Sequence, residues 1–313
     1  MKIHRNIEEL KGIKNPVVTT GSFDGVHVGH KAIIRRLKKL AKDINGETVL
    51  ITFDPHPRRV LYPDAEGKDL LMILSQKEKI ELMEKTGLDH LMIVNFTKEF
   101  SQVSCIDFIE KIIVGILNAK IVVVGFNHQF GYQRQGDFEY LYKLGRTHNF
   151  DVEEIPEQDI QNESVSSTKI RKALLQGNIQ RANAYLDHYY LVKGIPEFLP
   201  TRSEDFKRDI YNLEIEENVK LIPPDGVYAV SISSDGFNCK GILSIINWGI
   251  KNNFLSDEIQ IEFHPLEKDG FFADREVNIY FHKRIRDSSV SLDKEFVRAQ
   301  LVRDIMMVEE LIY

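Results

Sequence analysis

The stretch VVTTGSFDGVHVGHKAIIRRL, residues 17–37, decides how the first half of this chain folds. It begins with a short β-rich run, passes through Gly21 and Gly25, and continues as a basic amphipathic helical pattern. Glycine permits tight backbone turns that a larger residue would resist. The stretch therefore predicts a strand that leads through a tight turn into a helix.

The same alternation of β-rich runs and helical patterns continues to about Pro156. The further runs are ETVLITF, HLMIVNF, AKIVVVGF and DVEEIP, and amphipathic helical patterns separate them. Apolar runs separated in this way indicate a parallel sheet covered by helices on both faces. This half is therefore expected to be a Rossmann-like α/β domain, closed by one helix over residues 166–186.

After about Tyr189 the pattern changes to short β-rich runs with no helix between them. The runs are GVYAVSIS, CKGILSIINW, EIQIEFHPL and REVNIYFHKRI, and turns such as SSDG and EKDG separate them. Strands at this spacing predict a small antiparallel β-barrel, and residues 291–312 have helical periodicity. We therefore expect two domains, residues 1–187 and 188–313, of which the second ends in a helix.

Composition excludes several classes of protein. The chain has 313 residues, 42% hydrophobic and 28% charged, values typical of a soluble globular protein. Its net charge of -6 disfavours a nonspecific nucleic-acid binder, and two cysteines are too few for a disulfide framework or a cysteine metal site. The charged N-terminus lacks the apolar stretch of a signal peptide, and no run reaches the length of a membrane span. We expect a cytoplasmic protein without nucleic-acid or membrane partners.

His27 and His30 begin the helix that follows the glycine turn. They lie three residues apart, so both imidazoles can face one polyphosphate beside the N–H groups of the helix start. Gly29 is expected to leave room there for a bulky ligand. A structural or metal-binding pair is the alternative, but it would not require the glycine turn. The stretch lacks the ending of a Walker loop, and its geometry suits a nucleoside triphosphate.

Ser167 and Thr168 lie at the start of the next helical pattern, with Lys169 and Arg171 in its first turn. Hydroxyl groups at a helix start cap backbone N–H groups, and capping alone is ordinary helix chemistry. Positive charges at that end oppose the helix dipole, so they are better explained by an anion between them. Two helix N-termini could then bind one triphosphate.

Two further segments follow strands, at the places where open α/β sheets bind ligands. The prolines of FDPHP, residues 53–57, stiffen a turn that presents Asp54 and His56. In GFNHQFGYQRQGD, residues 125–137, the phenylalanines with Asn127 and Arg134 could contact an aromatic ring or a phosphate. A rigid loop without a ligand remains the alternative for both segments.

Together these segments resemble the bacterial bifunctional riboflavin kinase and FMN adenylyltransferase family, also called FAD synthetase. GSFDGVHVGH, FDPHP, GFNHQFGYQRQGD and SSTKIR occur in that family's order and spacing over roughly residues 15–190. The resemblance implies transfer of AMP from ATP to FMN, with Mg²⁺ bridging phosphate oxygens. It also implies catalytic roles for His27, His30 and Arg171, an ATP site at Gly21, Phe23, Asp24, Gly29, Ser167 and Thr168, and an FMN site at Asp54, His56, Asn127 and Arg134.

Residues 190–313 resemble a diverged riboflavin kinase module. DGVYAV, NWGIKNNF, IEFHPLE and FHKRIRD follow the module's order, and Glu262 occupies the place of its catalytic base. Where the family has Gly-Phe-Pro-Thr-Ala-Asn, residues 207–212 read KRDIYN, so only Asn212 is kept and Ile210 offers no oxygen to Mg²⁺. The resemblance thus implies a degenerate kinase with Asn212 and Glu262 as remnants; a purely structural Glu262 is the alternative.

Two other functions stay open. The HxGH arrangement serves several nucleotidyltransferases, so the acceptor could be a phosphorylated molecule other than FMN. The chain could also be a non-catalytic regulator that binds flavin or nucleotide. The intact histidines argue against a regulator, and FDPHP with GFNHQFG favours flavin over other acceptors.

Overall fold

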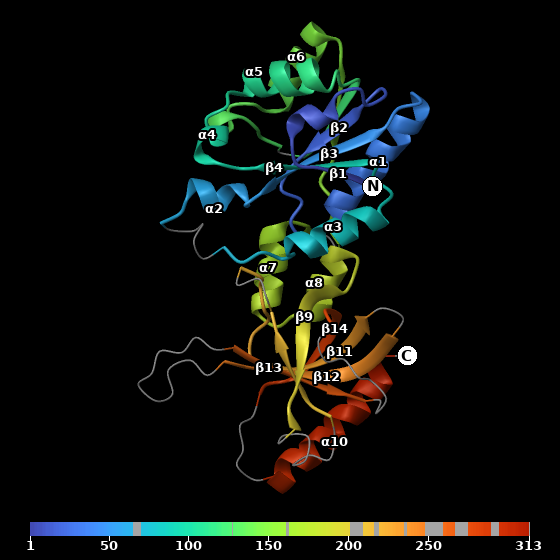
Figure 1. Ribbon diagram of the computed structural model, residues 1–313, viewed down its shortest axis with the longest axis vertical. Coiled ribbons are helices and arrows are strands. Elements are labelled where there is room, and N and C mark those ends of the chain that lie inside the picture. The colour runs from blue at the N-terminus through green and yellow to red at the C-terminus, as the bar shows by residue number, and fades with distance from the viewer. Residues whose placement is uncertain are drawn as a thin grey trace. The chain divides into compact units, whose positions relative to one another are not determined.

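The computed structural model describes the chain except for residues 65–69, 127, 161–162, 201–208, 216–218, 235–236, 248–258, 267–274, 289–293 and 313. The chain divides into two compact units (Figure 1). The first comprises Met1–Met72 and Lys79–Ser166, and the second comprises Ile73–Glu78 and Ser167–Tyr313. The sequence placed the boundary between residues 187 and 188, whereas the helices after Ser166 cluster with the barrel.

The first unit is built on a six-stranded sheet in the order β1-β4-β3-β2-β5-β6, with every neighbouring pair parallel. Its strands are β1 (Lys2–His4), β2 (Val17–Thr20), β3 (Thr48–Asp54), β4 (His90–Asn95), β5 (Ile121–Gly125) and β6 (Asp151–Ile155). The strand order reverses at β2, which lies between β3 and β5. Open α/β sheets bind ligands outside the carboxyl ends of their strands at such a reversal. The Rossmann-like fold is confirmed.

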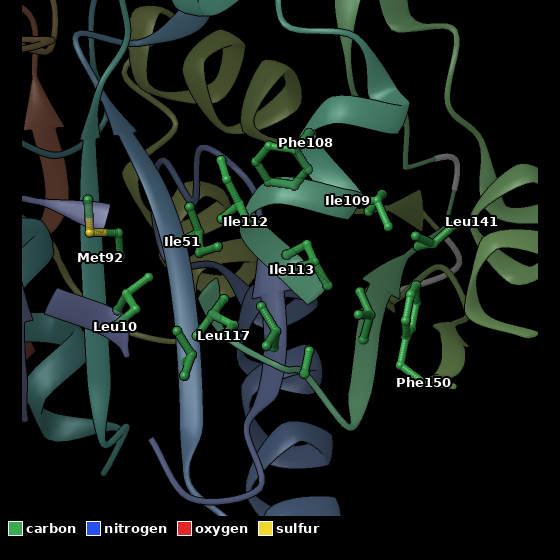
Figure 2. Close-up of a cluster of buried hydrophobic side chains, with 14 of the residues drawn as sticks. Leu10, Ile51, Met92, Phe108, Ile109, Ile112, Ile113, Leu117, Leu141 and Phe150 are labelled. Carbon is green, nitrogen blue, oxygen red and sulfur yellow. The ribbon is translucent and has the colours of Figure 1, made fainter. Parts of the chain in front are cut away.

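Helices cover both faces of this sheet (Figure 1). The helices between residues 1 and 148 are η1 (Ile7–Leu10), α1 (Val28–Asp43), α2 (Pro57–Leu61), α3 (Gln76–Lys85), α4 (Lys98–Ser101), α5 (Cys105–Asp107), the π-helix η2 (Phe108–Ile116), η3 (Tyr132–Arg134) and α6 (Phe138–His148). A short hairpin of β7 (Asp159–Ile160) and β8 (Glu163–Ser164) follows. Apolar residues one and four apart in η2 place Phe108, Ile109, Ile112 and Ile113 in a buried cluster that also contains Ile51 and Met92 of the sheet (Figure 2).

The second unit contains a closed antiparallel barrel in the order β10-β13-β12-β11-β14-β9, with β9 pairing to β10. Its strands are β9 (Tyr190–Phe198), β10 (Tyr211–Glu214), β11 (Gly226–Ser234), β12 (Phe237–Asn247), β13 (Ile259–Pro265) and β14 (Val277–Arg286). The last helix, α10 (Lys294–Leu311), contributes Val308 to a cluster with Val227, Ala229 and Ile242. The predicted barrel and final helix are confirmed. No helix in the described ranges, α10 included, is both long enough and apolar enough to cross a membrane.

The single helix predicted over residues 166–186 is wrong, because the structure has two helices there. These are α7 (Ser167–Leu175) and α8 (Ile179–Leu186), separated at Gly177, whose φ is 71°. The N–H groups of Gly177 and Asn178 donate to the last turn of α7, as at a glycine-terminated helix. In α8, the Asn183 amide donates to the Phe281 carbonyl of β14 at 2.8 Å, which ties this helix to the barrel.

Candidate active site

The turn of residues 21–26 joins β2 to α1 where the strand order reverses. Phe23, Gly25 and Val26 have positive φ values of 49°, 94° and 44°. Glycine adopts this conformation freely. For a residue with a side chain, the same conformation raises the free energy of the folded state by about 1 kcal/mol or more. The side chains of Phe23 and Val26 are 2% and 1% exposed, so their burial holds the strained turn in place. Strain maintained in this way is frequent at ligand sites.

His27 and His30 stack against each other at the start of α1. Their ring centroids are 3.6 Å apart, and the Phe23 ring lies 4.6 Å from that of His30. Burial, together with the nearby His27 and Lys79, holds the pKa of His30 well below its usual 6.5. His30 is therefore neutral at pH 7, and its Nδ1 has no hydrogen-bond partner among the described residues. The arrangement offers a neutral imidazole whose Nδ1 can bond to a ligand.

Lys79 on α3 lies against the same turn, and sequence reasoning did not find it. Its side chain is buried, at 3% exposure, and Nζ donates to the Ser22 carbonyl oxygen at 3.1 Å. Thr52 Oγ1 donates to the same oxygen at 3.1 Å. Lysine is almost never fully buried without a specific reason. The available signal was the spacing of Lys79 and the buried Met83, four residues apart on one helix face.

The glycines of the turn allow its own side chains to pack closely. A Cβ at Gly29 would lie 3.2 Å from Cε1 of His27, and one at Gly21 would lie 3.1 Å from the Phe23 ring. The space beside Gly29 is thus occupied by His27, where the sequence suggested room for a ligand. Asp24, in the middle of the turn, is fully buried.

The FDPHP segment forms the end of β3 and the start of α2. Asp54 is exposed at the carboxyl end of β3, and its backbone carbonyl accepts from the N–H of Phe96 at 3.1 Å. The Asp54–Pro55 peptide is cis. Nδ1 of His56 accepts from the N–H of Arg58 at 3.2 Å and so caps α2. His56 therefore has a structural task, whereas the Asp54 carboxylate remains accessible to a ligand.

The loop after β5 closes as a small hairpin. Phe130 and Gly136 exchange two backbone hydrogen bonds of 3.0 Å, and exposed Arg134 lies near the tip. Burial lowers the pKa of His128 to about 4, and its Nε2 has no partner within the described part of the chain. Asn127, one of the predicted FMN-binding residues, lies outside the described residues.

Ser167 and Thr168 begin α7, as expected from the sequence, whereas Arg171 is the fifth residue of this helix and lies at the start of its second turn. Thr168 is exposed, whereas Ser167 and Arg171 are partly buried. These three residues belong to the second unit. Their place beside the histidine pair remains a prediction.

The two residues predicted to be kinase remnants are paired in the barrel, where Asn212 of β10 is the direct cross-strand partner of Glu262 of β13. Glu262 is 2% exposed; Gln260 Nε2 donates to its Oε1 at 2.8 Å, and His264 Nε2 lies 3.8 Å from its Oε2. Ile210 is fully buried. The predicted remnants are thus adjacent. Ile210 supplies an apolar side chain where the riboflavin kinase family has the hydroxyl group of a threonine.

Two family models match separate parts of the chain. A family model described as FAD synthetase matches residues 10–169, and one described as riboflavin kinase matches residues 205–312. A crystal structure titled as a macrolide-efflux protein from Streptococcus pneumoniae has a TM-score of 0.88 and 25% identity, and covers 98% of each chain. This likeness supports the fold of the chain.

Curated relatives match over nearly the whole length. The bifunctional riboflavin kinase/FMN adenylyltransferase of Buchnera aphidicola subsp. Schizaphis graminum is 31% identical and covers 99% of this chain and 98% of its own. The protein of the same name from Listeria monocytogenes is 32% identical, over 93% of this chain and 90% of its own. The one from Escherichia coli K12 is 27% identical, over 99% and 97%. The chain therefore belongs to the bifunctional riboflavin kinase/FMN adenylyltransferase family.

Proposed function

We infer that this chain makes FAD by transferring the AMP part of ATP to the phosphate of FMN. The observation that carries this is the stacked pair His27 and His30 at the strand-order reversal, inside the segment that matches the FAD synthetase model. Open α/β sheets bind ligands at that place, which suits the binding of ATP by this turn. ATP and FMN are accordingly the substrates.

The reaction is a displacement at phosphorus. A phosphate oxygen of FMN attacks the α-phosphorus of ATP in line, the bond from that phosphorus to the bridging oxygen breaks, and pyrophosphate leaves with the electron pair. No covalent nucleophile is needed, so the protein must chiefly orient two polyanions and stabilise the charge that grows on the leaving group. We assign that stabilisation to His27, His30 and the N–H groups at the start of α1.

Mg²⁺ is proposed to be bound mainly by the phosphates of the nucleotide. The turn offers imidazole nitrogens, whereas Mg²⁺ prefers oxygen ligands and in nucleotide sites takes many of them from phosphate and water. The described residues contain no group of three or more His, Cys, Asp or Glu side chains arranged to hold a metal ion. When bound, the ion would supply neutralisation of phosphate charge.

The remaining site residues are proposed from the family resemblance. We propose residues 1–187 as the adenylyltransferase part of the chain and residues 188–313 as the kinase-like part. Arg171 would assist His27 and His30 in catalysis. ATP would be bound by Gly21, Phe23, Asp24, Gly29, Ser167 and Thr168, and FMN by Asp54, His56, Asn127 and Arg134.

The test is direct formation of product. The purified chain is incubated with FMN, ATP and Mg²⁺, the flavins are separated by chromatography, and pyrophosphate is measured in the same samples. FAD and pyrophosphate are expected in equal amounts. If no FAD forms while another phosphorylated acceptor becomes adenylylated, the flavin assignment fails and only the reaction class survives.

For the barrel we propose weak or absent phosphorylation of riboflavin. The match to the riboflavin kinase model, residues 205–312, includes the barrel strands from β10 to β14 but not β9. Glu262 and Asn212 are cross-strand partners. Phosphoryl transfer depends on a held metal and a positioned γ-phosphate. Buried Ile210 provides neither a metal ligand nor a hydrogen bond to phosphate.

A further inference from the structure

We propose that Lys79 is a positioning residue for adenylyl transfer, whose ammonium group holds the Ser22 carbonyl and thereby keeps the turn of residues 21–26 in the conformation that presents the histidine pair. The inference rests on the proposed function of that turn. The proposal gives a residue of α3 a role in the reaction. Neither the sequence motifs nor the family match assigns such a role to this helix.

The first support is the geometry around the Ser22 carbonyl oxygen. Lys79 Nζ from α3 and Thr52 Oγ1 from β3 both donate to this oxygen at 3.1 Å. Two donors from different elements fix the orientation of the peptide group between Ser22 and Phe23. That peptide group enters the strained part of the turn directly, because Phe23 is the first of its residues with positive φ.

The second support is the strain itself. Phe23 and Val26 adopt left-handed conformations that residues with side chains rarely occupy. Such conformations persist only where the surroundings over-determine them. Burial of the two side chains is one such constraint, and the clamp on Ser22 is the other. Without Lys79 the turn can relax, and the stacked rings of His27 and His30 lose their fixed orientation.

The third support is the charge that Lys79 places beside the histidines. Its side chain is 3% exposed, and it is one of the causes, after burial and His27, that lower the pKa of His30. A cation in a poorly hydrated place acts strongly on neighbouring groups because water screens it little. Lys79 therefore favours the neutral form of His30 before an anion arrives and adds attraction for the anion itself.

The test compares Lys79→Met with Lys85→Met, a matched control because Lys85 lies on the same helix but is exposed. We expect kcat/KM for ATP to fall about 10- to 100-fold in the first variant and to be unchanged in the second. Thr52→Val should lower kcat/KM as well. Since Thr52 and Lys79 share one acceptor, the double variant should lose less than the product of the two single losses.

A second readout separates positioning from simple stability. The His30 imidazole is titrated by NMR without substrates, and its pKa should rise in Lys79→Met but not in Lys85→Met. A folded Lys79→Met protein with wild-type kcat/KM would overturn the proposal. So would a loss of activity that follows the loss of thermal stability while the His30 titration is unchanged. If the wild-type chain makes no FAD at all, the proposed function fails, and the titration alone still tests Lys79.

Discussion

His30 combines a fixed position, a low pKa and an imidazole nitrogen that bonds to no described residue. Each property matters for charge stabilisation. The stacked His27 ring and the Phe23 ring hold the imidazole in one place, so little reorganisation accompanies the reaction. The neutral ring avoids repulsion with the buried Lys79 until the triphosphate supplies negative charge.

We expect His30→Ala to lower kcat by a factor that corresponds to about 2 to 4 kcal/mol, the usual loss for one donor of charge stabilisation. Steady-state rates of FAD formation give kcat and KM for ATP separately. His148→Ala, a substitution on the far end of α6, serves as the control. An unchanged kcat with a raised KM for ATP would show that His30 binds the ground state only.

At the scale of elements, the loop after β5 depends on one close approach of two backbones. Gly131 has φ of 75°, and a Cβ there would lie 2.6 Å from the backbone nitrogen and Cα of Cys105. The N–H of the next residue, Tyr132, donates to the Val103 carbonyl at 2.9 Å. The loop is therefore seated on the start of α5, and only glycine fits at the contact.

We expect Gly131→Ala to lower the free energy of unfolding by about 2 kcal/mol or more, because backbone strain and a clash add up. Gly12→Ala is the matched control: Gly12 has φ of 81° in the same unit, but nothing lies within 4 Å of its added Cβ. Denaturant unfolding of both variants separates the clash from the strain. Equal losses would mean that the approach to Cys105 contributes nothing.

The elements that the sequence predicted are those with a strong apolar pattern, namely the central parallel strands and most barrel strands. β1 was not predicted, because its three residues, Lys2–His4, carry no apolar pattern and form a strand through their pairing with β4. The break at Gly177 was overlooked because the apolar periodicity on either side suggested one helix. The sequence analysis also missed β9 and β10. These two strands are defined more by their pairing in the closed barrel than by an apolar pattern of their own.

The site residues also divide into those with a local sequence motif and those whose role depends on tertiary packing. The histidine pair was predictable because a strand, glycines and a helix start form a continuous motif. Lys79 was not, since its importance arises only when α3 packs against the turn. The capping role of His56 likewise depends on where α2 begins.

The barrel gives a prediction about riboflavin. We expect the full chain to convert riboflavin and ATP to FMN at a rate close to background, because Ile210 cannot bind a metal and Glu262 alone cannot place a γ-phosphate. Chromatography of flavins after incubation with riboflavin, ATP and Mg²⁺ measures this, with FAD formation from FMN in the same preparation as the control. Robust FMN formation would show that another segment supplies the metal ligand.

At the scale of the whole molecule, the histidines with a lowered pKa all make the free energy of unfolding change in the same direction when acid is added. Burial is the largest cause that lowers the pKa of His30, His90, His128 and His282. Each therefore binds a proton more readily in the unfolded chain, so the free energy of unfolding falls as pH drops below about 6.5. The carboxyl groups with lowered pKa, Glu99, Asp107 and Glu276, act in the same direction but only below about pH 4.5.

The interval from pH 7.5 to 5 thus reports mainly on the histidines, and His128 and His282 allow one test in each unit. For both, the pKa falls from 6.5 to about 4. For His128 this shift corresponds to about 2 kcal/mol of stability lost by pH 5. His282 is partly exposed, with Nε2 2.9 Å from Ser231 Oγ, so solvent reduces its share below that of His128. We expect His128→Gln to flatten the fall of unfolding free energy with pH in the first unit more than His282→Gln does in the second. Urea unfolding at several pH values, followed by signals specific to each unit, measures both slopes. Slopes identical to those of the wild type would mean that these imidazoles titrate alike in the folded and unfolded chain, and that their burial carries no penalty for charge.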